Sequence, residues 1–167
     1  VQIRAELDKN INAGILPTPT ADTLFMIHFP PTLKITFKSD GTLPTSFQQF
    51  CAYHMNFESK KYGSVYYGVI PNLDSVACSF GCGSGGSLAR QTVCASHELI
   101  EAVTDAIPTP GNKPGFPQAW NTTDGSEVGD LCQSNTGTLK GKAGDYKLQQ
   151  EWNNSITACT TGDYTSN

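Results

Sequence analysis

The segment from residue 94 to residue 105 combines a helical apolar pattern with one histidine and three carboxylates, in a chain where only 16% of the residues are charged. His97, Glu101 and Asp105 recur at every fourth position, which places them on one face of an α-helix. Apolar residues occupy the other faces, so the helix must pack against further elements. The acidic face then requires either solvent or a bound cation.

Glu98 follows His97 directly, and Glu101 lies one helical turn beyond that histidine. Zinc hydrolases use this layout: two ligands one turn apart hold the ion, and the glutamate beside the first activates a zinc-bound water molecule. The common motif has histidine where this chain has Glu101. We therefore expect His97 and Glu101 to bind zinc and Glu98 to act as general base. The alternative is a solvated acidic face without a metal.

Asp105 lies too far along the same helix to share an ion with His97. At a rise of ~1.5 Å per residue the two positions are about 12 Å apart along the axis. We therefore expect Asp105 outside the ligand set, where it orients a ligand from the side. A carboxylate near a helix C-terminus opposes the helix dipole, and Lys113 is a candidate partner for it.

A hydrolytic zinc ion takes three protein ligands and keeps one open position for water. The third ligand must come from elsewhere in the sequence, and Glu127 and Asp130 are the best candidates because they stand three residues apart beside a cysteine. His54, in a predicted strand, is the other candidate. Together with Asp124, the two acids also offer the oxygen ligands that calcium prefers, so a calcium site or a solvated loop is the alternative.

The chain contains an even set of cysteines: Cys51, Cys78, Cys82, Cys94, Cys132 and Cys159. With glycosylation sequons at Asn121 and Asn153, they predict an oxidising, extracellular setting with up to three disulfides. The pairing we favour is Cys78–Cys82, Cys132–Cys159 and Cys51–Cys94. The alternative is a zinc knuckle on Cys78 and Cys82 with Cys94 or Cys51. The chain opens on Val1, as expected of a processed, mature protein.

Composition excludes several classes of partner. The net charge of −4 gives no electrostatic basis for binding nucleic acid or an anionic membrane surface. No apolar run approaches the ~20 residues that a membrane-spanning helix needs. The length of 167 residues fits a single domain over 1–167. We therefore expect a secreted, globular protein.

The order of the predicted elements indicates an α+β fold. A helix is expected over 1–13, followed by strands over 23–29, 33–37, 50–57 and 65–71. One long motif-bearing helix follows over about 88–106, capped by Ser87 and ended by Pro108. The C-terminal half is expected to be irregular and disulfide-stapled, with a last strand over 146–152. A small β-sheet ahead of the motif-bearing helix is a zincin-like layout. His28, in an apolar run, is expected to be a core histidine.

Several short motifs resemble those of the exordium-like proteins, also called phosphate-induced proteins. The motifs are Phe50–His54, Tyr66–Pro71, Ser96–Asp105, Ala119–Trp120, Glu127–Cys132 and the closing segment from Trp152 to Cys159. The resemblance extends over roughly residues 20–160. It implies a secreted protein, associated with the cell wall in plants and with relatives in microbes, that carries a His-Glu helix.

Two functions from different classes are compatible with this sequence. The first is a secreted zinc-dependent hydrolase, a metallopeptidase in which Tyr53, Tyr66 or Tyr67 stabilises the oxyanion. Its acidic second ligand, Glu101, lowers the net charge of the site and weakens the Lewis acid. The second is a non-catalytic secreted protein that binds a carbohydrate or matrix component and holds a structural zinc or calcium ion. The expected partner is accordingly a peptide or a polysaccharide.

Overall fold

The computed structural model describes residues 2–38, 41–74, 82–108 and 119–162 of this chain. The described part is a mixed α+β structure with two helices and three small sheets. Its first half contains α1 (Gln2–Asn12), β1 (Leu24–His28), β2 (Tyr53–Ser59), β3 (Gly63–Ile70) and α2 (Ser87–Thr104). Its second half contains η2 (Asp130–Cys132), β4 (Thr136–Gly141), β5 (Gly144–Gln149), β6 (Glu151–Asn153) and β7 (Ala158–Thr160).

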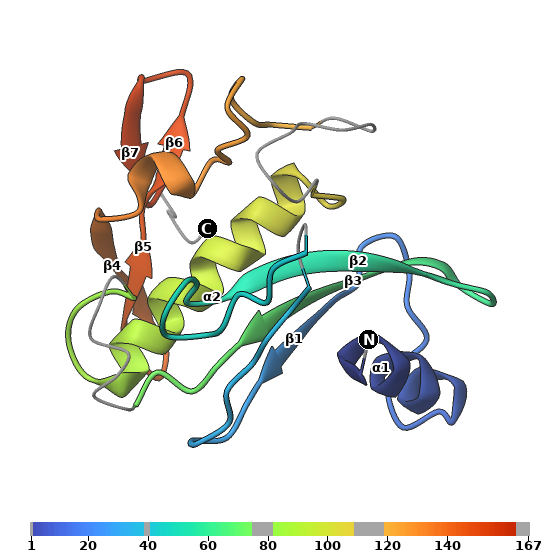
Figure 1. The fold of residues 1–167 in the computed structure, drawn as a ribbon. Helices are drawn as coiled ribbons and strands as arrows, with labels where there is room; N and C mark the ends of the chain where they lie inside the picture. Colours follow the sequence, from blue (N-terminus) through green and yellow to red (C-terminus); the bar gives the residue numbers. More distant parts are fainter. Residues whose placement is uncertain (1, 39–40, 75–81, 109–118, 163–167) are drawn as a thin grey trace.

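The two helices lie on opposite faces of a three-stranded sheet (Figure 1). The strand order is β1-β3-β2, with β1 parallel and β2 antiparallel to β3. Leu7 of α1 packs with Tyr67 and Val69 of β3, and the Arg4 side chain donates a hydrogen bond to the Tyr67 hydroxyl at 3.0 Å. The other face of the sheet supports α2, which therefore lies between this sheet and β5.

The alternation of side chains along β2 places His54 on the α2 face of the sheet. Tyr53, Met55 and Phe57 pack into the core on the α1 side, so His54 points the other way. His54 stands opposite Gly68 of β3, where an added Cβ would lie 3.8 Å from the Glu98 Cβ and 2.7 Å from the Met26 Sδ. The glycine thus lets α2 approach the sheet closely beside His54.

The helix α2 buries its acidic residues and exposes part of its apolar side. Glu98 and Glu101 are 4% and 3% exposed, whereas Val103 is 72% exposed. The interpretation of a solvated acidic face is therefore wrong. The prediction of Ser87 as N-cap is also wrong, because Gly86 takes that position and Ser87 is already helical.

The C-terminal half is more regular than predicted. Two antiparallel hairpins, β4–β5 and β6–β7, occupy most of residues 136–160, and β5 covers α2. The Thr92 hydroxyl of α2 donates to the Lys147 carbonyl, and the Gln149 N–H of β5 donates to the Ser96 hydroxyl at 3.0 Å. The predicted strand over 33–37 is reduced to a single bridge between Thr36 and Thr45.

Two disulfides staple the described residues. Cys132–Cys159 joins η2 to β7 as predicted, and Cys51 pairs with Cys82. The predicted pairs Cys51–Cys94 and Cys78–Cys82 are therefore wrong. The fold brings Cys51, which precedes β2, next to Cys82, which precedes α2. Cys94 is buried beside Leu73 and Cys82 in a small core cluster. Cys78 lies outside the described residues.

Candidate metal centre

Histidine and carboxylate side chains from three separate segments converge between β2, α2 and the turn that leads into η2. His54 comes from β2, His97 and Glu101 come from α2, Glu127 comes from the turn, and Asp130 is the first residue of η2. These side chains form two groups, in each of which one ligand atom per residue lies within 4.8 Å of the others. We call them the outer group (His97, Glu101 and Asp130) and the inner group (His54, Glu101 and Glu127).

The outer group contains the pair that the helical spacing predicts. The His97 Nε2 lies 3.0 Å from the Glu101 Oε2, one turn along α2. Asp130 completes the group from an exposed position, and its Oδ2 accepts a hydrogen bond of 3.0 Å from the Glu127 N–H. This contact within the turn orients the Asp130 carboxylate. The structure thus brings together His97, Glu101 and one of the two predicted third ligands.

The inner group is more deeply buried and is centred on His54, which is 5% exposed. The His54 Nδ1 lies 3.3 Å from the Glu98 Oε2 and 3.8 Å from the Glu101 Oε2. The Nε2 atom lies 2.9 Å from the Asp105 carbonyl oxygen and 3.6 Å from the Glu127 Oε1. His54 therefore contacts Glu98 and Glu101 of α2, Glu127 of the turn, and the main chain of Asp105 just after α2.

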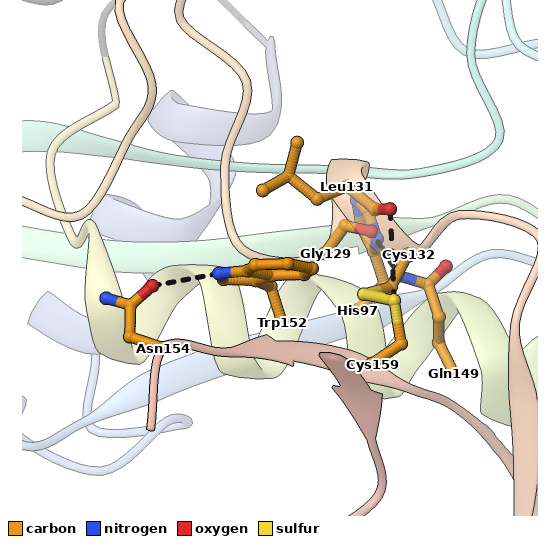
Figure 2. Close-up of a disulfide and its surroundings, with 8 residues drawn as sticks. All are labelled: His97, Gly129, Leu131, Cys132, Gln149, Trp152, Asn154 and Cys159. Carbon is orange, nitrogen blue, oxygen red and sulfur yellow. Dashed lines mark hydrogen bonds between the residues drawn. A yellow bond between two sulfur atoms is a disulfide. The ribbon is translucent and has the colours of Figure 1, made fainter. Parts of the chain in front are cut away.

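Residues around the Cys132–Cys159 disulfide hold the His97 ring at its Nδ1, whereas its Nε2 faces Glu101 (Figure 2). The Gln149 Nε2 lies 2.8 Å from the His97 Nδ1 and donates to the Gly129 carbonyl at 2.8 Å. Gln149 is itself 5% exposed. The amide thus connects β5, α2 and the turn, and it fixes the ring that faces Glu101.

Gly129 has no side chain, and the side chains of His97 and Glu101 fill the space where its Cβ would lie. A Cβ at this position would lie 2.5 Å from the His97 Nδ1 and 2.8 Å from the Glu101 Oε1. The Gly129 backbone has φ −77° and ψ −38°, which any residue adopts, so only the lack of space requires glycine. Any side chain here would displace the imidazole or the carboxylate.

The donors present fit a zinc ion. Zinc binds imidazole nitrogens and carboxylate oxygens at about 2.0–2.2 Å, and a His-Glu-carboxylate set leaves a fourth position open. The Oε1 atoms of Glu101 and Glu127 are buried and accept no hydrogen bond from the described residues. A buried carboxylate oxygen without a partner is costly, and a cation removes that cost. Asp124 belongs to neither group, which leaves the predicted calcium set incomplete.

The carboxylates around the two histidines shift the histidine pKa values upwards. Burial lowers the pKa of His54, but the hydrogen bond to Glu98 and the charges of Glu98, Glu127 and Glu101 outweigh it and raise the pKa to about 9. Burial likewise lowers the pKa of His97. The hydrogen bond to Glu101 and the charges of Glu98, Glu101 and Glu151 raise it to about 10. Without a metal, both rings are therefore doubly protonated and positively charged at neutral pH.

The same crowding raises the pKa of Glu101 and Glu127. Burial, then the charge of Glu101, raises the pKa of Glu127 to about 8, although His54 opposes the shift. Burial is also the main reason why the pKa of Glu101 is raised, against its hydrogen bond to His97. The centre therefore binds protons more tightly than free side chains do, and a metal ion must displace them.

The outer group opens into a cleft of about 390 Å³. His97, Glu98 and Asp130 line it together with Phe47, Phe50 and Gln133. Glu98 thus faces the cleft beside the outer group while its Oε2 contacts His54. A substrate in this cleft would lie next to both the proposed ligands and the proposed base.

Several other predicted residues lie outside the centre. Tyr53 and Tyr67 belong to the core on the α1 side of the sheet, so the prediction that either one stabilises an oxyanion is wrong. His28 is exposed at the end of the edge strand β1, so the prediction of a core histidine is also wrong. The Asn121 side chain donates to the Asp105 carboxylate at 3.5 Å, and Lys113 lies outside the described residues. The Asn153 side chain accepts a hydrogen bond from the Ser155 N–H.

Sequence patterns do not identify three residues of the centre. Gln149 and Gly129 position His97, and Glu151 lies near that histidine; of the three, only Gly129 belongs to one of the short motifs, Glu127–Cys132. Burial, then the charges of Glu101 and Glu98, raises the pKa of Glu151 to about 7, and His97 and Gln149 oppose this shift. The only signal in the sequence for Gln149 and Glu151 is that both lie within the predicted strand over 146–152.

Comparison with known proteins adds no family to this picture. No protein-family model, curated protein or solved structure matches the chain. The resemblance to the exordium-like proteins therefore stays a prediction that rests on the short motifs alone. Neither described helix combines the length and the apolar character that crossing a membrane requires.

Proposed function

We propose that this protein is a secreted zinc-dependent hydrolase and that its substrates are peptides. The observation that carries the proposal is the grouping of His97, Glu101 and Asp130 beside a cleft that His97, Asp130 and Glu98 line. Imidazole with carboxylate is a donor set of hydrolytic zinc sites, whereas calcium takes oxygen ligands almost exclusively.

Each residue of the centre has a distinct role in this proposal. His97, Glu101 and Asp130 hold the ion, which as a Lewis acid lowers the pKa of water and polarises a carbonyl group. Glu98 accepts the proton of the attacking water molecule and passes it to the leaving amine. Its Oε2 contacts His54, and Glu98 also lines the cleft, which supports this role.

The cleft supports a peptide as the substrate class. Phe47 and Phe50 provide apolar contacts, and the amide of Gln133 matches the hydrogen-bonding groups of a peptide backbone. The disulfides Cys51–Cys82 and Cys132–Cys159 support an oxidising compartment and thus secretion. Glycosylation at Asn121 and Asn153 is part of the same proposal.

The experiment is elemental analysis of the purified protein followed by a casein or peptide assay with and without a chelator. The proposal expects bound zinc, hydrolysis that the chelator abolishes, and recovery when zinc is returned. His28→Ala is the matched control, because His28 is an exposed strand histidine that belongs to neither ligand group. Hydrolysis that persists after complete removal of the metal contradicts the proposal.

The second candidate is a non-catalytic binding protein whose metal is structural. The burial of Glu98, Glu101 and Asp105, each at 4% exposure or less, favours it because structural ions also neutralise buried carboxylates. Its ligand would be a carbohydrate or another matrix component. Tightly bound metal with no cleavage of casein or peptides would select this candidate over the hydrolase.

A further inference from the structure

Glu127 and Asp130 are three residues apart, yet their carboxylates belong to different groups of potential ligands. Asp130 completes the outer group and Glu127 completes the inner group, while Glu101 is common to both. A carboxylate has two oxygens and can serve two cations, and hydrolytic two-metal sites hold their ions about 3.5–4 Å apart. We propose that the inner group binds a second zinc ion beside the ion of the outer group. This inference rests on the proposed function, because both ions share Glu101.

The orientation of His54 is that of a metal ligand. The Asp105 carbonyl oxygen only accepts hydrogen bonds, so the Nε2 atom, 2.9 Å away, carries the proton of a neutral ring. Such a bond from the far nitrogen to a backbone carbonyl is the support that metal-ligating histidines commonly have. When the ring is neutral, the Nδ1 lone pair is then available to a metal ion on the side where Glu98 and Glu101 lie, at 3.3 and 3.8 Å.

Two buried oxygen atoms provide an independent observation at the same place. The Glu101 Oε1 and the Glu127 Oε1 make no hydrogen bond within the part of the chain that the structure describes. Glu101 is 97% buried, since 3% of its surface is exposed. A buried oxygen without a partner destabilises the fold, and more strongly so when it is charged. A cation in each group gives both oxygens a partner.

The charge of the centre also favours two ions over one. Six carboxylates, those of Glu98, Glu101, Asp105, Glu127, Asp130 and Glu151, lie around His54 and His97. No lysine or arginine among the described residues forms an ion pair with any of them. One divalent cation leaves most of this negative charge uncompensated, whereas two divalent cations remove most of it.

The test is the number of zinc ions that the full chain binds. The metal-stripped protein is titrated with Zn²⁺ by calorimetry, and the zinc content is measured after gel filtration. The wild type should bind two equivalents. Glu127→Gln should bind one, because it weakens the inner group alone, and Asp130→Asn should also bind one. Glu58→Gln, an exposed glutamate of β2, is the matched control and should bind two.

A second variant protects the test against misfolding. His54→Gln can keep a hydrogen bond to the Asp105 carbonyl, and circular dichroism shows whether it is folded. The folded variant should bind one equivalent. A wild type that binds one equivalent, unchanged in Glu127→Gln and His54→Gln, overturns the second ion.

The failure of this inference is distinguishable from the failure of the proposed function. One equivalent together with chelator-sensitive hydrolysis overturns the second ion and leaves the hydrolase intact. Two equivalents without hydrolysis support the second ion and overturn the hydrolase. Absence of bound zinc at micromolar concentrations overturns both.

Discussion

The Nδ1 of His54 lies 3.3 Å from the Oε2 of Glu98, although 44 residues separate them in the sequence. This contact joins β2 to α2 across the face of the sheet where Gly68 leaves room for the helix. It fixes one oxygen of Glu98, which also lines the cleft. The sheet therefore positions the residue that we propose as the general base.

Glu98→Gln should retain zinc and lose hydrolysis. The amide keeps the size of the side chain and its contact with His54, but it does not accept the proton of the attacking water. Loss of a general base lowers the rate by about 10²–10⁴-fold. The turnover number and the zinc content are measured on the same preparation, with Glu58→Gln as control. Undiminished turnover in Glu98→Gln would remove this residue from the mechanism.

Gly129→Ala should weaken zinc binding without unfolding the protein. The added methyl would lie 2.5 Å from the His97 Nδ1, so the ring must move away from its position opposite Glu101. Displacement of a ligand by a fraction of an ångström should reduce zinc affinity by about 10–100-fold, the range seen when supporting contacts are lost. Calorimetric titration with Zn²⁺ measures this change.

Gly86→Ala is the control for this prediction. Its added methyl meets no atom within 4 Å, and its φ of −69° is accessible to alanine. Only the helix cap is affected, at a cost of about 1 kcal/mol or less. Equal zinc affinity in Gly129→Ala and Gly86→Ala would show that Gly129 does not limit the position of His97.

The stability of the metal-free protein should fall as the pH rises. The pKa values of His54 and His97, about 9 and 10, lie above the ordinary histidine value, so the folded state binds more protons than the unfolded state does. The stabilisation that these two histidines provide is complete below about pH 6.5. It is lost as the pH rises through their raised pKa values. The raised pKa values of Glu127 and Glu151, about 8 and 7, act in the same direction from about pH 4.5 upwards.

Zinc should reverse this trend, because the ion displaces the same protons and its affinity grows with pH. The midpoint of thermal unfolding is measured between pH 5 and pH 8.5, once with chelator and once with zinc. The difference between the two midpoints should widen as the pH increases. A metal-free midpoint that rises steadily over this range is the opposite of what these pKa values require.

The double variant Cys132→Ser/Cys159→Ser should lose both stability and zinc affinity. The disulfide closes a segment with a sequence separation of 27 residues. The entropy of closing such a loop corresponds to about 3–4 kcal/mol of folding free energy. Cys132 also lies in η2 with Asp130, so its release loosens one ligand of the outer group.

Val65→Ala separates these two effects. Val65 is fully buried in β3, on the sheet face that α1 covers, and its truncation should cost about 2 kcal/mol. Its zinc affinity should stay at the wild-type value. Urea unfolding and calorimetric titration are compared for the two variants, and equal loss of zinc affinity in both would show that stability alone controls binding.

The sequence predicts the local part of the centre well. Helical spacing alone places His97 and Glu101 one turn apart, and the short interval between Glu127 and Asp130 identifies the turn that joins them. The strands at β1, β2 and β3 also follow from aromatic and β-branched density. These features depend on periodicity within one element, which the sequence records directly.

The remaining features depend on how distant elements meet. His54 is on the polar face of a strand whose other face carries Tyr53, Met55 and Phe57, so alternation indicates that it differs from its neighbours. Alternation does not indicate that Gly68 brings α2 to that face. The pairing of Cys51 with Cys82 and the contact of Gln149 with His97 likewise depend on tertiary arrangement.

The most direct test of the zinc centre is a crystal structure of the zinc-loaded protein, with anomalous diffraction recorded at the zinc edge. We predict an anomalous peak bounded by His97, Glu101 and Asp130, with one atom of each within about 2.0–2.2 Å of the ion. A fully loaded crystal without an anomalous peak between these three side chains would contradict the account.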